Sequence, residues 1–250
     1  MHLIKGMLFD KDGTILNVDR LWGPVGVDLA EMSEKNYGLS NEQTRGLMKA
    51  IGVKNGSVVP DSVLSSGTAK EISTRIFEAL SAFGVKTEFE KLDGEVRKSI
   101  KRSISRNIEL IQPLGDLKSD FGRLRALGIT IGLATADMQE TTMFCLRRLG
   151  VEHYFSFIGA EESTSRFKPD PELFLKFCSS SGLKPQQVAM VGDSQVDIEM
   201  GRAGGAALTV AVDADENGRG RAAADYSISS IDGLFDDDGE PIWASGGAEP

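Results

Sequence analysis

The 250-residue chain predicts an α/β fold: a doubly wound parallel sheet with a smaller, all-helical domain inserted after its first strand. Short apolar runs recur along the chain, and segments of helical length and period separate the later runs. The span 17–107 interrupts this alternation after the first run. A chain of this length can bury the core of one large domain and a smaller companion.

Five apolar runs are expected to form the strands of the sheet. They are continuous rather than alternating, which is typical of strands covered on both faces, as in a parallel sheet. The predicted strands cover residues 6–9, 129–134, 155–158, 188–191 and 207–212.

Helices are expected between the later strands. Pro171 after Asp170 fits a helix start, and Gly128, Gly150 and Gly182 stand where helices end. The predicted helices cover residues 117–127, 139–149, 171–181 and 196–203.

The remaining segments set the domain boundaries. Residues 17–107 show helical patterning broken by a Gly/Ser/Pro-rich loop at 55–60, which predicts a helical second domain. The core domain would then comprise residues 1–16 and 108–235, and the acidic, Ala/Gly-rich residues 236–250 would form a frayed tail.

The composition disfavours some classes of binding partner. The formal net charge of −9 disfavours a nucleic-acid partner, and the basic stretch 97–102 has the spacing of a solvated helix face. No apolar run approaches the roughly 18 residues of a membrane span, and without a charged-then-apolar stretch near residue 1 we expect no leader. The two cysteines, Cys145 and Cys178, fall in predicted helices, which favours a reducing compartment. We expect a cytoplasmic protein that binds neither nucleic acid nor membrane.

Polar residues follow four of the predicted strands, at the edge of an open parallel sheet where ligands bind. Asp10 and Asp12 follow the first strand and Thr135 the second. Lys168 follows the third, just before a helix start. The fourth strand leads into the stretch 192–197, which contains Asp193 and Asp197.

Each stretch alone could be a turn or a helix cap, because Asp, Thr and Gly are ordinary residues there. Together, a purely structural explanation needs four coincidences in the right order and at the same sheet edge. We therefore expect one polar site.

The four stretches resemble the four motifs of the haloacid dehalogenase superfamily of phosphotransferases. Residues 10–14, Asp-Lys-Asp-Gly-Thr, match its first motif, Thr135 the second, Lys168 the third, and the stretch from Asp193 to Asp197 the fourth. The helical insert stands where that superfamily carries a C1-type cap. The resemblance covers residues 5 to about 232 and is strongest to the phosphoglycolate-phosphatase-like branch.

The chemistry of phosphate esters accounts for these residue types. A carboxylate that attacks phosphorus splits a hard displacement into two steps through an aspartyl-phosphate, and we assign this role to Asp10. Asp12 can protonate the leaving oxygen and then activate the hydrolytic water. Lys168 can neutralise the transferring group, and the Thr135 hydroxyl with the backbone amides beside it, at Ala136, can bind its oxygens.

Two anions facing a phosphate require a hard divalent cation, and oxygen ligands favour Mg²⁺. The resemblance implies that Asp10, the backbone carbonyl of Asp12, and Asp193 bind this ion. It implies a supporting place for Asp197, around these ligands or through water.

Three other activities and one non-catalytic role are alternatives to a phosphatase. Asp12 argues against a dehalogenase, which resembles this motif in its nucleophile but lacks the second Asp. A C–P bond cleaver needs a lysine from the insert, where Lys35, Lys49, Lys54 and Lys70 are candidates. A sugar-phosphate mutase shares both aspartates and stays the principal alternative. A non-catalytic binding protein is less favoured because all the charged site residues are present.

The substrate is expected to be a small phosphorylated metabolite, such as phosphoglycolate or a sugar phosphate. Candidates for its leaving-group pocket are Arg20, Trp22, Arg45 and the stretch 65–68, which equally fits a helix cap. The protein is expected to be a monomer or a homodimer.

Overall fold

The computed structural model describes residues 4–60, 62–212 and 224–244. The chain divides into two compact units, which we describe separately. The first unit comprises Met1–Leu16, Pro113–Thr135 and Leu146–Pro250, and the second comprises Asn17–Gln112 and Ala136–Cys145.

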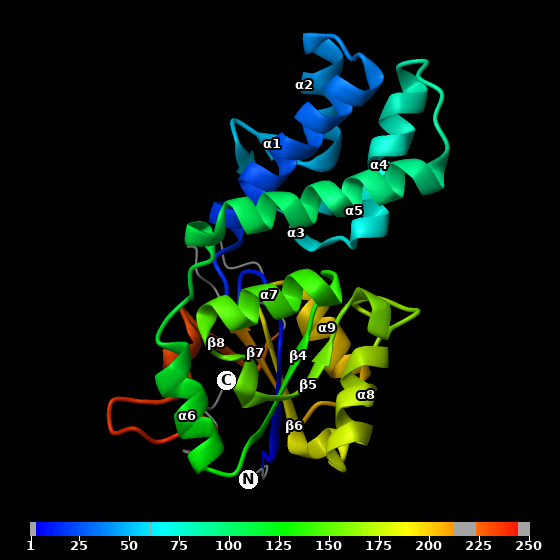
Figure 1. Cartoon of the computed structure of the whole chain (residues 1–250). Helices are drawn as coiled ribbons and strands as arrows, with labels where there is room; N and C mark the ends of the chain where they lie inside the picture. The colour runs from blue at the N-terminus through cyan, green and yellow to red at the C-terminus, as the bar shows by residue number, and fades with distance from the viewer. Residues whose placement is uncertain (1–3, 61, 213–223, 245–250) are drawn as a thin grey trace. The chain divides into compact units, whose positions relative to one another are not determined.

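A six-stranded parallel sheet forms the centre of the first unit (Figure 1). Its order is β5-β4-β1-β6-β7-β8, so β1 lies between β4 and β6. The strands are β1 (Gly6–Phe9), β4 (Thr130–Ala134), β5 (Phe155–Gly159), β6 (Val188–Gly192), β7 (Leu208–Val212) and β8 (Tyr226–Ile228). The predicted doubly wound parallel sheet is confirmed, and its first five strands lie where the apolar runs predict them. β8 lacks such a signal because it has only three residues, with a serine at its centre.

The helices between these strands also lie where the sequence predicts them. The α8 helix begins where the Asp170 carboxylate accepts the Glu172 amide at 3.0 Å, and it ends at Gly182 with a φ of 68°. The helices are α6 (Leu117–Ala126), α7 (Gln139–Leu149), α8 (Glu172–Ser181) and α9 (Gln195–Ala203), with short 3-10 turns at Glu152–Tyr154, Glu161–Ser163, Pro185–Gln187 and Ile231–Leu234.

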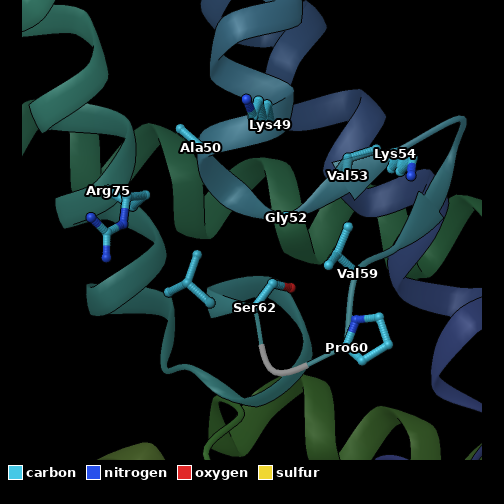
Figure 2. A pocket seen from close by; sticks show the side chains of 10 residues that line it. Lys49, Ala50, Gly52, Val53, Lys54, Val59, Pro60, Ser62 and Arg75 are labelled. Carbon is cyan, nitrogen blue, oxygen red and sulfur yellow. The ribbon is translucent and has the colours of Figure 1, made fainter.

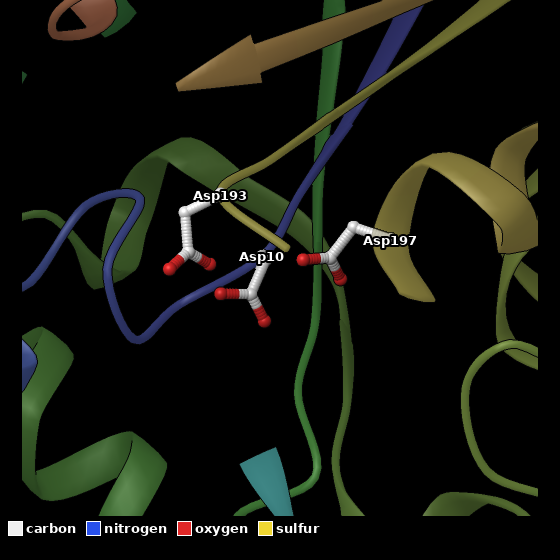
Figure 3. A group of neighbouring side chains, drawn as sticks. All are labelled: Asp10, Asp193 and Asp197. Carbon is white, nitrogen blue, oxygen red and sulfur yellow. The ribbon is translucent and has the colours of Figure 1, made fainter. Parts of the chain in front are cut away.

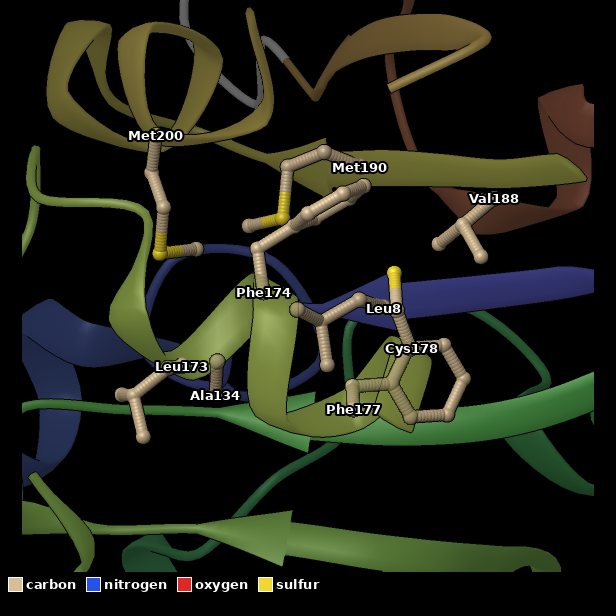
Figure 4. Close-up of a cluster of buried hydrophobic side chains, with 9 residues drawn as sticks. All are labelled: Leu8, Ala134, Leu173, Phe174, Phe177, Cys178, Val188, Met190 and Met200. Carbon is tan, nitrogen blue, oxygen red and sulfur yellow. The ribbon is translucent and has the colours of Figure 1, made fainter. Parts of the chain in front are cut away.

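Both faces of the sheet are covered, as the continuous apolar strands require. Leu8 belongs to a fully buried cluster with side chains of α8, α9 and the neighbouring strands (Figure 4). Phe9, the next residue, contacts Phe121 of α6 with ring centroids 5.3 Å apart. Because successive side chains of a strand point to opposite faces, β1 is anchored from both sides, and the residue that follows it is held in place.

The described residues of segment 17–112, the larger part of the second unit, form five helices and one hairpin. They are α1 (Val18–Tyr37), α2 (Asn41–Ile51), the hairpin strands β2 (Val53–Lys54) and β3 (Ser57–Val58), α3 (Val63–Ser66), α4 (Ala69–Ala82) and α5 (Phe89–Arg106), with a 3-10 turn at Ile108–Leu110. The expectation of an all-helical insert therefore omits the hairpin. Its turn is Asn55-Gly56, with φ values of 53° and 79°, because this pair readily adopts the left-handed conformations of a two-residue hairpin.

A cavity of about 830 Å³ lies in the second unit, between α2, the hairpin, α3 and α4 (Figure 2). Its lining includes Lys49 and Lys54 but, among the described residues, none of the predicted pocket residues Arg20, Trp22 and Arg45. In the predicted stretch 65–68, Thr68 instead forms a capping box with Glu71 at the start of α4.

The end of the chain differs from the expected frayed tail. The Phe235 ring lies against the Arg123 guanidinium, 3.7 Å from ring centroid to Cζ, and Arg123 also donates to the Gly239 carbonyl. The Asp236 amide in turn donates to the Glu240 carbonyl at 2.9 Å. Residues 236–240 therefore form a hydrogen-bonded turn, while residues 245–250 of the predicted tail lie outside the described residues.

Among the described residues, no helix combines the length and the apolar character needed to span a membrane.

Candidate active site

The carboxyl edge of the sheet carries the charged residues of the first unit that the sequence singled out. Asp10 directly follows β1, and its amide donates to the Val191 carbonyl of β6 at 2.8 Å. Asp193 directly follows β6, and Asp197 lies in the first turn of α9. Because β1 and β6 are paired in register, these carboxylates meet at one point of the edge.

Three carboxylates form the centre of the site (Figure 3). One carboxylate oxygen from each of Asp10, Asp193 and Asp197 lies within 4.8 Å of the other two. Asp10 is 7% exposed and Asp197 1% exposed. Such a group of buried carboxylates is costly unless cations compensate it.

Lys168 supplies one compensating charge. Its Nζ donates to Asp10 Oδ1 at 2.6 Å and to Asp197 Oδ1 at 2.7 Å. Burial opposes the charged ammonium, but the negative charges of Asp10 and Asp197 outweigh burial and raise the pKa of Lys168. The lysine therefore stays charged across the physiological range.

One ammonium does not balance the negative charge of three carboxylates. The pKa values of Asp10 and Asp193 are raised accordingly. Burial raises the pKa of Asp10 to about 7; Lys168 opposes this shift, and the charges of Asp197 and Asp12 add to it. Burial also raises the pKa of Asp193, and the charges of Asp10 and Asp197 act in the same direction. An all-oxygen donor set with surplus negative charge fits a divalent cation. The residues present thus fit the metal site that the sequence predicts.

Gly13 shapes the loop that carries the site. Its φ is +84°, and a Cβ atom at this position would lie 2.1 Å from Asp193 Oδ2. The next residue, Thr14, donates a long hydrogen bond of 3.5 Å to Asp10 Oδ2. Gly13 therefore lets the Asp193 carboxylate approach the loop closely, and Thr14 donates to the Asp10 carboxylate, in addition to their part in the turn.

The structure brings some of the predicted site residues together and leaves the roles of others untested. The structure brings Asp10, Lys168, Asp193 and Asp197 together, with Asp197 inside the carboxylate group rather than around it. Thr135 is buried after β4, beside β1, and its amide donates to the Gly159 carbonyl at 2.9 Å. The phosphate-binding roles of Thr135 and of Ala136, the next residue, stay predictions.

The Asp12 carboxylate contacts a residue that sequence reasoning missed. Asp12 Oδ2 lies 2.5 Å from Nζ of Lys11, which is fully buried. The signal was the middle residue of Asp10-Lys11-Asp12, where a lysine directly follows an apolar strand.

A family model described as haloacid dehalogenase-like hydrolase matches residues 4–205. The chain belongs to this family. The match spans the first unit's strands from β1 to β6, together with the whole inserted segment between β1 and β4.

Several known proteins are similar to this haloacid dehalogenase-like hydrolase. A phosphorylated carbohydrates phosphatase of Thermotoga maritima is 25% identical over 203 residues, covering 81% of this chain and 82% of that protein. A phosphoglycolate phosphatase of Chromobacterium violaceum is 31% identical over 120 residues, covering 48% of this chain and 54% of that protein. The crystal structure of a β-phosphoglucomutase from Clostridium difficile has the same fold, with a TM-score of 0.63, 20% identity, and coverage of 92% of this chain and 93% of that chain.

Proposed function

We propose that this hydrolase is a phosphatase that cleaves a small phosphomonoester through an aspartyl-phosphate on Asp10. The observation that carries the proposal is the placement of Asp10, which is held at the end of the central strand with its Oδ1 bound to Lys168. A fixed carboxylate beside a fixed ammonium suits attack on a phosphoryl group whose negative charge must be neutralised.

The reaction has two displacements. An Asp10 carboxylate oxygen forms a bond to phosphorus as the bond from phosphorus to the leaving oxygen breaks, and that oxygen takes a proton from Asp12. Asp12 then accepts a proton from water as the water oxygen attacks phosphorus. This second displacement breaks the bond between phosphorus and Asp10, and it releases inorganic phosphate.

The surplus negative charge supports Mg²⁺ as the cofactor. Asp10, Asp193 and the Asp12 backbone carbonyl are the proposed ligands, and Asp197 lies close enough to Asp10 and Asp193 to support them. When bound, Mg²⁺ supplies positive charge that favours the approach of an anionic substrate and holds Asp10 ionised. Lys168 alone cannot both attract the anionic substrate and hold Asp10 ionised, because it already shares its charge between Asp10 and Asp197.

The proposed substrate is phosphoglycolate-like or a sugar phosphate, since similar proteins are named phosphoglycolate phosphatase and phosphorylated carbohydrates phosphatase. A cytoplasmic location, a monomeric or homodimeric state and the lack of a nucleic-acid or membrane partner stay predictions. The mutase alternative differs in outcome, since a mutase returns an isomeric phosphate ester instead of inorganic phosphate.

The test measures inorganic phosphate released from a panel of phosphoglycolate, sugar phosphates and nucleotides, with Mg²⁺ or with a chelator. We expect Mg²⁺-dependent release that Asp10→Asn lowers by at least about a thousandfold. The matched control is Asp236→Asn, which removes a carboxylate from the turn at residues 236–240 and should leave release unchanged. Formation of an isomeric phosphate ester without net release would favour the mutase. Release that persists in Asp10→Asn would contradict the role of Asp10.

A further inference from the structure

Lys11 is a fully buried lysine that the proposed reaction does not use. Its side chain is 1% exposed, and its Nζ lies 2.5 Å from Asp12 Oδ2. Lysine is almost never fully buried unless it is paired, because removing an ammonium from water is costly. The partner that compensates this cost is the carboxylate proposed to transfer the proton.

The loop fixes the backbone of both residues independently of their ion pair. The Lys11 carbonyl accepts the amides of Ile15 and Leu16, both at 3.0 Å. Asp12 forms a β-bridge with Leu16, and the Gly13 amide donates to the Leu16 carbonyl at 2.8 Å. Neighbouring side chains on a strand point to opposite faces, so this contact between residues 11 and 12 belongs to the turn after β1. The ion pair therefore fixes the Asp12 side chain on a backbone that is already ordered.

The site thus has two lysines with separate partners. Lys168 binds Asp10 and Asp197, whereas Lys11 binds Asp12. The Asp12 carboxylate lies outside the group of three carboxylates whose oxygens are within 4.8 Å of one another. It is nevertheless close enough for its charge to act on Asp10. Without the Lys11 ammonium, the ionised form of Asp12 would add a fourth negative charge beside the cluster.

We propose that Lys11 is the positioning residue of Asp12: its ion pair holds the Asp12 carboxyl group apart from the carboxylate cluster and available to the leaving oxygen. This inference rests on the proposed function, because it needs Asp12 to exchange a proton with the leaving group. Lys11 would act through the Asp12 carboxylate, with which its ammonium is paired.

Leaving groups of different basicity separate this role from a structural one. A sugar phosphate releases an alkoxide that needs a proton, whereas p-nitrophenyl phosphate releases a stable anion that does not. In Lys11→Met we expect single-turnover cleavage of the sugar phosphate to fall at least tenfold. The burst of p-nitrophenolate, which reports attack by Asp10 alone, should change less than about threefold. Methionine is a suitable replacement because it matches the length of the lysine stem and removes only the charge.

A double-mutant cycle shows whether Lys11 acts through Asp12. In an Asp12→Asn background, Lys11→Met should cause no further loss of sugar-phosphate cleavage. The proposal would be overturned by a second loss as large as the first, by equal losses on both substrates, or by no loss in Lys11→Met.

Thermal unfolding gives a second readout that needs no substrate. Lys11→Met leaves Asp12 without its cation, so we expect a lower Tm for this variant than for Lys11→Met/Asp12→Asn. Strictly additive Tm shifts of the two substitutions would overturn the ion pair, and with it the proposal, even if Lys11→Met is too unstable to assay. A wild-type chain that releases no phosphate would overturn the proposed function instead, while the Tm cycle would still decide the pairing of Lys11.

Discussion

Gly13 is the residue at which backbone conformation and site chemistry are most tightly linked. Its φ of +84° disfavours any side chain, and the space of its missing Cβ is occupied by the Asp193 carboxylate. A side chain here would either strain the loop or displace Asp193 from Asp10. The glycine that looks like ordinary turn chemistry in the sequence is therefore a spacing requirement of the carboxylate cluster.

Gly13→Ala should lower kcat/KM by about 100-fold, because a shift of about 1 Å in a positioned group has this order of effect. It should also raise the Mg²⁺ concentration needed for half-maximal activity. Steady-state kinetics across a Mg²⁺ titration measure both effects.

The matched control is Gly182→Ala. This glycine also has a positive φ, +68°, but no atom lies within 4 Å of its missing Cβ. It should cost about 1 kcal/mol of stability and leave the activity unchanged. Equal losses of activity in the two variants would show that backbone strain, and not the displacement of Asp193, accounts for the effect.

At this scale, the sequence predicts the residues that follow strands but not their partners. Asp10, Lys168 and Asp193 could be found because each lies next to an apolar run or a helix start. The direct bond between Lys168 and Asp197 could not be predicted, because it depends on where α9 turns its first residues. The Lys11 pairing with Asp12 was equally hidden, since strand alternation would separate neighbouring side chains.

At the scale of elements, α6 contains a carboxylate with no catalytic assignment. Asp120 is 3% exposed, and within the described part of the chain its Oδ2 has no hydrogen-bond partner. Burial raises its pKa from 3.8 to about 6; the charges of Asp232 and Asp116 add to the shift, and Arg123 opposes it. Compared with the unfolded chain, the folded state therefore favours the protonated form of the Asp120 carboxyl group.

This shift predicts how the stability of the chain depends on pH. A raised folded-state pKa contributes stability that is fully present below pH 3.8 and is lost as pH rises through about 6. Asp120→Asn removes this loss. Its free energy of unfolding should exceed that of the wild type by about 1–3 kcal/mol at neutral pH, and the difference should vanish near pH 3.8. Urea unfolding at the two pH values measures it, and an equal difference at both would contradict the account.

Elements that repeat a hydrophobic pattern along the chain could be predicted. Short elements that depend on a few neighbouring residues could not. Five of the sheet's strands and the helices α6 to α9 could be predicted because apolar runs of strand length alternate with segments of helical period. The hairpin of β2 and β3 looks like a loop in the sequence, because its strands have only two residues each and its turn signal is confined to Asn55-Gly56. The hydrogen-bonded turn at 236–240 could not be predicted, because the acidic composition of this stretch gives no sign of the contact between Phe235 and Arg123.

At the scale of the whole molecule, the family match and the sheet topology account for where the chemistry lies. The first unit supplies the charged residues Asp10, Lys168, Asp193 and Asp197 from segments far apart in the chain. The second unit contains the cavity but none of these charged residues. Sequence alone predicts such a division but cannot assign residues 136–145, which cluster with the second unit although they follow β4 directly.

The most direct test of the central claim is detection of the covalent intermediate. The wild-type chain with Mg²⁺ and a cleavable phosphomonoester from the panel would be quenched in acid within the first turnover, digested and mapped by mass spectrometry. The account predicts one phosphoryl group on the peptide containing Asp10, its loss on a longer incubation, and its absence in Asp10→Asn. Phosphate release at the same rate with no phosphorylated Asp10 at any quench time would contradict nucleophilic catalysis by this residue.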